Sequence, residues 1–136
     1  MNQFFLFMKL IGTRTHGFLD YIVGLLLIAA PWIFDFNKGG AETWVPVILG
    51  AVTILYSLLT DYEMGISNKI SMRTHLTLDM VSGIFLAVSP WLFGFTDYIW
   101  EPHVIVGVLE IVVVLMTRTS PSTEHSTAHR HTAATH

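Results

Sequence analysis

The amino-acid sequence predicts an all-α protein, a bundle of four transmembrane helices built from two tandem two-helix repeats. Three observations support this prediction. The chain has 136 residues, of which 52% are hydrophobic and only 12% charged, whereas a soluble domain carries about 25% charged residues. Its mean hydropathy is +0.57. Four apolar stretches are long enough for membrane spans, and the first of them aligns with the third.

The four predicted spans cover about residues 14–36, 43–60, 73–95 and 102–117. A helix crosses a hydrocarbon core of ~30 Å with about 20 residues, because each residue adds about 1.5 Å. Apolar residues occupy every face of these stretches, as expected where lipid surrounds a helix. The connections between them are short, so we expect sequential helices to be antiparallel neighbours.

The segments outside the spans complete the predicted domain organisation. Residues 1–12 contain an apolar run but no small-residue cleavage site, so we expect an uncleaved segment that lies in the membrane interface. Residues 13–61 form the first two-helix repeat, residues 62–71 a cytoplasmic linker and residues 72–118 the second repeat. Residues 119–136 are rich in Ser, Thr and His without apolar periodicity, which predicts a disordered tail.

The distribution of basic residues predicts the orientation in the membrane. Six of the 7 Lys and Arg residues fall on one side of the four-span arrangement, and Lys38 alone falls on the other. Because cytoplasmic loops retain positive charge, we expect a multi-pass protein of the cell (inner) membrane with both termini in the cytoplasm. All 4 tryptophans gather at the external ends of the spans, where aromatic rings settle at headgroup level.

An internal repeat is the most specific feature of the sequence. Residues 13–36 align without gaps with residues 72–95, at an offset of 59, and 11 of the 24 aligned positions are identical. The identities include Arg, His, Asp, Gly, Pro and Trp in one register, which apolar composition alone does not produce. The second helices match more loosely, at an offset of 57. Because each unit has an even number of spans, we expect a pseudo-two-fold axis along the membrane normal.

A short motif near the end of the first helix of each unit resembles that of a known family. The second unit has Ser89, Pro90 and Trp91, and the first unit has Ala30, Pro31 and Trp32 in their place. Over about residues 13–118 the sequence resembles the SPW-repeat membrane proteins of bacteria and archaea. The resemblance implies an integral membrane protein of four helices, and it carries over no activity and no catalytic residue.

The motif also has a direct physical interpretation. A proline in a helix lacks an N–H group and frees the carbonyl four residues earlier. The carbonyls freed here are those of Leu27 and Leu86. We favour a kink or an early helix end, with the tryptophan as an interfacial anchor. The alternatives are a hinge and an aromatic-lined mouth for a lipid or a quinone. Ser89 is a candidate donor to a backbone carbonyl.

A polar constellation lies at the predicted cytoplasmic ends of the first and third spans. His16 and Asp20 are four residues apart and share a helix face, and the same spacing recurs in the second unit. An ionised aspartate within lipid must be paired, so we expect it to bond to a histidine or to an arginine of the other unit. We predict one polar cluster that locks helix packing, made of Arg14, His16, Asp20, Arg73, His75 and Asp79.

Three functional alternatives for this cluster stay open: a proton relay, a metal site of two histidines and two aspartates, and ligation of haem by both histidines. The acids beside the imidazoles count against haem. Glu110 is the deepest intramembrane acid, midway along the fourth span, and the aligned residue of the first unit is Thr53. This asymmetry argues against a relay that both units share.

Enzyme motifs are absent from the sequence, which has no nucleotide-binding glycine loop, no HExxH, no GxSxG and no cysteine. The Lys and Arg residues form no basic stripe, which excludes nucleic-acid binding. We therefore expect a non-catalytic structural or accessory component that acts through helix packing, without a cofactor or a metal. Its expected partners are the lipid bilayer and either further copies of the chain or subunits of a larger membrane complex.

Two alternative functions follow from the same residues. The first is a small transporter or a proton- or ion-conducting protein that uses Asp20, Asp79 and Glu110, since ionisable groups within a membrane often serve transport. The second, less favoured, is a redox subunit that binds haem or quinone.

Overall fold

The computed structural model describes residues 9–119. This range forms four α-helices and no β-strand: α2 (Thr13–Ile33), α3 (Ala41–Leu59), α4 (Met72–Leu92) and α5 (Glu101–Leu115). The prediction of an all-α protein is therefore confirmed. The predicted tail from residue 120 onwards, and residues 1–8 of the predicted interfacial segment, lie outside the described residues.

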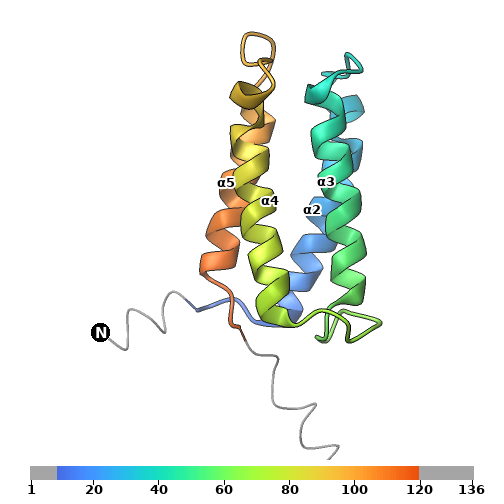
Figure 1. The fold of residues 1–136 in the computed structure, drawn as a ribbon, viewed down its shortest axis with the longest axis vertical. Helices are drawn as coiled ribbons and strands as arrows, with labels where there is room; N and C mark the ends of the chain where they lie inside the picture. Colours follow the sequence, from blue (N-terminus) through green and yellow to red (C-terminus); the bar gives the residue numbers. More distant parts are fainter. Residues whose placement is uncertain (1–8, 120–136) are drawn as a thin grey trace, which may run out of the picture.

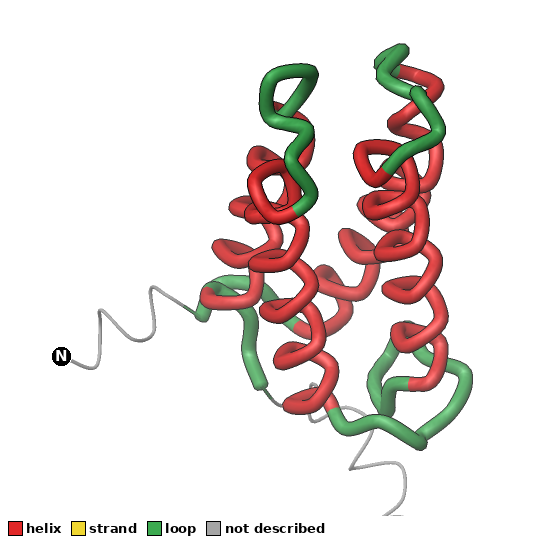
Figure 2. The backbone as a smooth tube through the Cα atoms, turned by 45° about the horizontal axis from the view of Figure 1, so that its top comes forward, coloured by secondary structure: helices red, strands yellow, loops and turns green. Residues whose placement is uncertain are grey.

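The helices form two antiparallel hairpins that stand side by side (Figure 1). α2 packs along α3, α4 packs along α5, and the contact between α3 and α4 joins the hairpins. The connections within the hairpins lie at one end of the bundle, which we call the loop end. The α3–α4 connection lies at the opposite end together with residues 9–12 and 116–119, and we call this the terminal end (Figure 2).

Three of the helices, α2, α3 and α4, are long and apolar enough to cross a membrane. Large apolar side chains are exposed along them, among them Leu25, Ile48 and Ile84, as expected for helices that face lipid. α5 has 15 residues, and a helix of that length is about 22 Å long. It is therefore shorter than a hydrocarbon core of ~30 Å.

Facing glycines let the two helices of each hairpin pack closely. A Cβ atom built at Gly50 of α3 would lie 2.5 Å from the carbonyl oxygen of Gly24 of α2. A Cβ atom built at Gly107 of α5 would lie 2.5 Å from the carbonyl oxygen of Gly83 of α4. A side chain larger than hydrogen does not fit at either crossing. Such backbone contact associates helices where lipid removes the hydrophobic driving force.

α2 and α4 each end two residues after their proline, at Ile33 and Leu92. The predicted spans end at residues 36 and 95, so each helix is three residues shorter at this end than predicted. In α4 the Ser89 hydroxyl donates a hydrogen bond of 2.7 Å to the carbonyl oxygen of Leu86. This is the carbonyl that Pro90 leaves without its helical donor. Ser89 thus supplies the missing hydrogen bond, whereas Ala30 at the aligned position of α2 has no hydroxyl to do so.

Two backbone bridges close the terminal end of the bundle. Ile11 pairs with Thr117, and Ile70 pairs with Thr60, each as an isolated parallel bridge. The N–H of Ile11 donates to the carbonyl of Met116 at 2.9 Å. The segment before α2 is therefore tied to the end of α5, and the segment before α4 is tied to the end of α3. The bridges bring both threonines beside the first turns of α2 and α4.

Candidate functional site

Two histidines and two aspartates from α2 and α4 meet in the interior near the terminal end. Nε2 of His16 lies 2.6 Å from Oδ2 of Asp79. Nε2 of His75 lies 2.6 Å from Oδ2 of Asp20. Contacts of 3.0 and 3.1 Å also join each histidine to the aspartate four residues along its own helix. All four residues are buried, and we call this closed set of contacts the His/Asp ring.

Each imidazole also bonds to a threonine that follows the second helix of the other hairpin. Nδ1 of His16 lies 2.8 Å from Oγ1 of Thr117. Nδ1 of His75 lies 2.8 Å from Oγ1 of Thr60. Both ring nitrogens of each histidine therefore contact the opposite hairpin, and the contacts come in matched pairs.

The threonines determine where the imidazoles carry their protons. Oγ1 of Thr60 donates to the backbone carbonyl of Tyr56 at 2.6 Å, and Thr117 donates likewise to the carbonyl of Val113. A hydroxyl has one hydrogen, so each threonine oxygen accepts its second hydrogen bond from an imidazole Nδ1–H. We assign the histidine tautomers on this network.

The remaining protons lie between the imidazoles and the carboxylates. With Nδ1 protonated, Nε2 of a neutral histidine is an acceptor, and a carboxylate oxygen is an acceptor too. Each contact of 2.6 Å between Nε2 and Oδ2 therefore contains one proton. With one proton for each of the two contacts, two neutral imidazoles and two carboxylates, the His/Asp ring is electrically neutral as a whole.

The two aspartates differ in the partner of their second oxygen. The hydroxyl of Tyr56 on α3 donates a hydrogen bond to Oδ1 of Asp79. Thr53 lies 3.3 Å from the same hydroxyl. The residues of α5 that align with Tyr56 and Thr53 are Val113 and Glu110. The space beside one aspartate is therefore filled by a phenol, and the matching space has only a valine.

A cavity of about 210 Å³ lies between α2 and α5, where the phenol has no counterpart. Its polar lining residues are His16, Asp20, Asp79 and Glu110, and its remaining walls are Leu and Val side chains of the two helices. Glu110, the predicted intramembrane acid, thus shares a cavity with three members of the His/Asp ring. The ring is open to this cavity on the side of α5.

Arg14 and Arg73 are not part of the ring. Both side chains are exposed in the first turns of their helices, and every ion pair found for the aspartates among residues 9–119 is with a histidine. The expected alternative, an arginine of the other unit as partner of each aspartate, is therefore wrong. A long arginine side chain at a helix end extends towards the polar boundary, whereas an imidazole four residues from the acid already fits between the helices.

Tyr62, in the α3–α4 connection, covers the ring from the terminal end. Its ring centroid lies 5.4 Å from that of His75. Gly17 provides the space, since a Cβ atom there would lie 2.6 Å from the Tyr62 hydroxyl oxygen. Burial raises the pKa of Tyr62 above its ordinary value. An uncharged phenol therefore closes this side of the ring.

Three residues that hold the ring are not evident from the sequence: Tyr56, Thr60 and Thr117. For the threonines a signal was available, because they coincide at the offset of 57 at which the second helices align. Tyr56 aligns with a valine, so the repeat carried no signal for it. An isolated tyrosine in an apolar helix is usually interpreted as a residue of the core or of the membrane interface.

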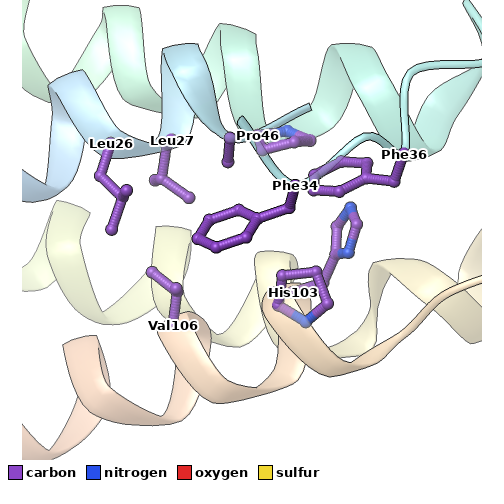
Figure 3. Close-up of a pocket in the computed structure, with 9 residues that line it drawn as sticks. Leu26, Leu27, Phe34, Phe36, Pro46, His103 and Val106 are labelled. Atoms are coloured by element: carbon purple, nitrogen blue, oxygen red, sulfur yellow. The ribbon is translucent and has the colours of Figure 1, made fainter. Parts of the chain in front are cut away.

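A second, much smaller cavity lies at the loop end. Figure 3 shows Phe34, Phe36 and His103 around it. Its volume is about 20 Å³, which is enough for a single water molecule. The His103 ring lies 5.4 Å from that of Phe36 and 4.9 Å from that of Phe95, and its Nε2 donates to the carbonyl of Glu42 at 2.9 Å. His103 therefore links α5 to the start of α3 through this hydrogen bond.

Comparison with known protein families gives one match. The SPW repeat domain family matches residues 14–117, a range that includes the whole His/Asp ring and both of its threonines. No curated protein and no solved structure matches the chain.

Proposed function

The chain belongs to the SPW repeat family, and three of its helices are long and apolar enough to cross a membrane, so it is a small membrane protein. We propose that it is a structural or accessory component without catalytic activity. It acts by helix packing. The observation that carries this proposal is that both nitrogens of each buried histidine bond to the opposite hairpin. The polar groups of the ring thus serve the contact between the hairpins.

The energetics of a bilayer support a packing role. An ionisable side chain at the centre of a helix costs about 2.5–3.5 kcal/mol to insert when it has no partner. Hydrogen bonds between membrane helices contribute about 0.6–2 kcal/mol each. The pairing of Asp20 with His75, and of Asp79 with His16, offsets the cost only when the hairpins are together. Separation of the hairpins would leave each aspartate with only the longer contact, of 3.0 or 3.1 Å, to the histidine of its own helix.

The proposal extends to the arrangement in the membrane. The matched contacts of the ring support two tandem repeats related by a pseudo-two-fold axis along the membrane normal. We propose that α5 is a fourth span, because it runs antiparallel along α4 and polar turns flank both of its ends. The charge asymmetry of the sequence then favours the terminal end as the cytoplasmic side of the cell membrane.

We also propose that the protein associates beyond the monomer, with further copies of itself or with another membrane protein. Aromatic side chains are exposed around the loop end: Trp32, Phe34, Trp44, Trp91, Phe93 and Trp100. Four helices offer little interior in which to bury them. A mass above that of one chain in native nanodiscs, or a stoichiometric partner after mild purification, is the expected result. A single monomeric mass without a partner in both detergent and nanodiscs would contradict association.

A second candidate function is proton or ion conduction. The observation that favours it is the cavity between α2 and α5, because Asp20, Asp79 and Glu110 line it together, and intramembrane acids that face a cavity mark ion pathways. The haem alternative has less support, since the Nε2 atoms that would bind iron both point at carboxylates.

One pair of measurements distinguishes packing from conduction. Proton flux into liposomes and thermal unfolding in detergent are compared for the unchanged protein and for Asp20→Asn, with Asp97→Asn in the exposed α4–α5 connection as the matched control. The packing function predicts flux no greater than in empty liposomes and a lowered unfolding midpoint for Asp20→Asn alone. Flux that Asp20→Asn abolishes without a loss of stability would overturn packing in favour of conduction.

A further inference from the structure

We propose that the His/Asp ring is a binding site for one divalent transition-metal ion of the zinc type, held by Nε2 of His16 and His75 and by one carboxylate oxygen each of Asp20 and Asp79. The ion enters in exchange for the two protons of the ring. This inference goes beyond the packing role, because it assigns a ligand to the residues that join the hairpins.

The geometry supplies a complete set of four converging donor atoms. One ligand atom from each of the four residues lies within 4.8 Å of all the others. Neighbouring donors are 2.6–3.1 Å apart. A tetrahedral zinc site with bonds of about 2.0–2.1 Å separates its donors by about 3.3–3.5 Å. To admit an ion, the two pairs at 2.6 Å have to open by about 0.7–0.9 Å and the two pairs at 3.0 and 3.1 Å by about 0.2–0.5 Å.

The outer partners of the histidines point to a ligand at Nε2. A histidine that binds a metal donates its other ring N–H to an acceptor, which holds the tautomer and the ring orientation. Here Nδ1–H of each histidine is directed at a threonine oxygen whose own hydrogen is committed to a backbone carbonyl. The lone pair of each Nε2 is thereby aimed into the ring.

Charge balance favours a divalent ion. The ring with its two shared protons is neutral, and two neutral imidazoles, two carboxylates and one divalent cation are neutral as well. When one M²⁺ ion binds to the doubly protonated ring, two protons leave the ring for solvent. The exchange therefore adds no net charge to a low-dielectric interior. Imidazole nitrogen is a ligand for zinc, copper, iron and nickel, whereas magnesium and calcium favour oxygen ligands.

The cavity between α2 and α5 provides access to the ring. Tyr56 occupies the space beside Asp79 on the α3 side, and Tyr62 covers the ring at the terminal end. On the α5 side the ring borders a space of about 210 Å³ that Glu110 also lines. This space is large enough for an ion with several waters, so an ion reaches the donors beside Asp20.

The experiment must separate the ring from the histidines of the tail. His125, His129, His131 and His136 lie outside the described residues, and a run of this kind binds metal weakly on its own. The protein is therefore studied as the full chain with these four residues replaced by asparagine. It is purified in detergent, treated with a chelator and titrated with cobalt(II) chloride and, separately, zinc chloride.

Three readouts are expected from this chain. It binds one ion per chain, cobalt gives the intense absorption of a tetrahedral site, and calorimetry in two buffers of different ionisation enthalpy reports about two protons released per ion. An excess of magnesium chloride does not displace the zinc. The substitution Thr117→Val, which removes the acceptor of one Nδ1–H, weakens zinc binding by about 10- to 100-fold.

Matched variants decide whether the ring is the site. His16→Gln and Asp79→Asn lose stoichiometric binding, and Asp97→Asn keeps it. If a ring variant does not fold, the tail-substituted chain with an intact ring still tests the proposal. Zinc must raise the unfolding temperature of that chain, and cobalt must give the tetrahedral spectrum with it. No binding to that chain, an octahedral cobalt spectrum, or binding that His16→Gln leaves unchanged would overturn the proposal. A result that overturns the metal site does not contradict the packing function, because that function is tested by the stability of the protein without metal.

Discussion

The imidazole of His16 on α2 lies nearer to Asp79 on α4 than to the aspartate on its own helix, with Nε2–Oδ2 distances of 2.6 and 3.0 Å. These two residues are 63 positions apart in the chain. Their contact belongs to tertiary structure, because it exists only when the hairpins are assembled. The stability of the bundle is therefore expected to depend on the ring far more than on any exposed polar residue.

The Ser89 hydroxyl, near the end of α4, is expected to contribute measurably to the stability of the protein. Ser89→Ala removes the donor to the Leu86 carbonyl and leaves a buried acceptor unsatisfied, which should lower the free energy of unfolding by ~1 kcal/mol. Ala30→Ser adds the corresponding donor to α2, so it should stabilise by up to ~1 kcal/mol. Chemical unfolding in mild detergent measures both. Equal stability of Ser89→Ala and the unchanged protein would show that this hydrogen bond contributes nothing.

The crossing of α4 and α5 should not tolerate even one methyl group. Gly107→Ala places a Cβ atom 2.5 Å from the Gly83 carbonyl oxygen and 2.7 Å from the Ala87 nitrogen. Both are backbone atoms, so the helices must separate, at a cost of about 1–3 kcal/mol. Gly12→Ala is the matched control, because a Cβ atom there meets nothing within 4 Å. A loss of stability that is the same for both variants would contradict close packing at this crossing.

The Tyr56 hydroxyl should contribute to the stability of the bundle, whereas the Tyr62 hydroxyl should not. Tyr56→Phe removes the donor to Oδ1 of Asp79, a hydrogen bond to a charged group worth about 1.5–3 kcal/mol. The buried Tyr62 hydroxyl has no hydrogen-bond partner among residues 9–119, so Tyr62→Phe should leave the thermal unfolding midpoint close to that of the unchanged protein. Equal midpoints for the two variants would count against the role of Tyr56.

The proposed orientation can be tested by labelling, since the chain has no native cysteine. Lys38→Cys and Thr96→Cys, both at the loop end, should react with a membrane-impermeant thiol reagent added from outside the cell. Lys69→Cys, in the α3–α4 connection, should react only after the cytoplasmic side is opened. Reaction of the two loop-end cysteines only from the cytoplasm would reverse the orientation.

Much of the architecture could be predicted from the sequence. Long apolar stretches predict helices because lipid and helix geometry set their length, and α2, α3 and α4 appear where expected. The i, i+4 spacing of His16 and Asp20 placed both on one helix face, so a polar cluster was predictable. Their partners across the hairpins were not, because spacing along one helix does not determine which face meets the next helix.

The threonines and the arginines show the limits of sequence patterns. Thr60 and Thr117 lie just beyond helix ends, where a polar residue is unremarkable in a sequence, and only the backbone bridges bring them to the imidazoles. Arg14 and Arg73 share the register of the ring residues in both units, which made them look like members of it. Their length lets them extend away from the buried acids, so a shared register did not imply a shared site.

The most direct test of the central claim, that the His/Asp ring joins the two hairpins, is a double-mutant cycle on Asp20→Asn and Asp79→Asn in chemical unfolding. Each single substitution should lower stability by ~1–2 kcal/mol, the scale of hydrogen bonds between membrane helices. Because both aspartates share the same pair of histidines, the double variant should lose less than the sum, by at least ~0.5 kcal/mol. Strict additivity, or single variants as stable as the unchanged protein, would contradict the claim.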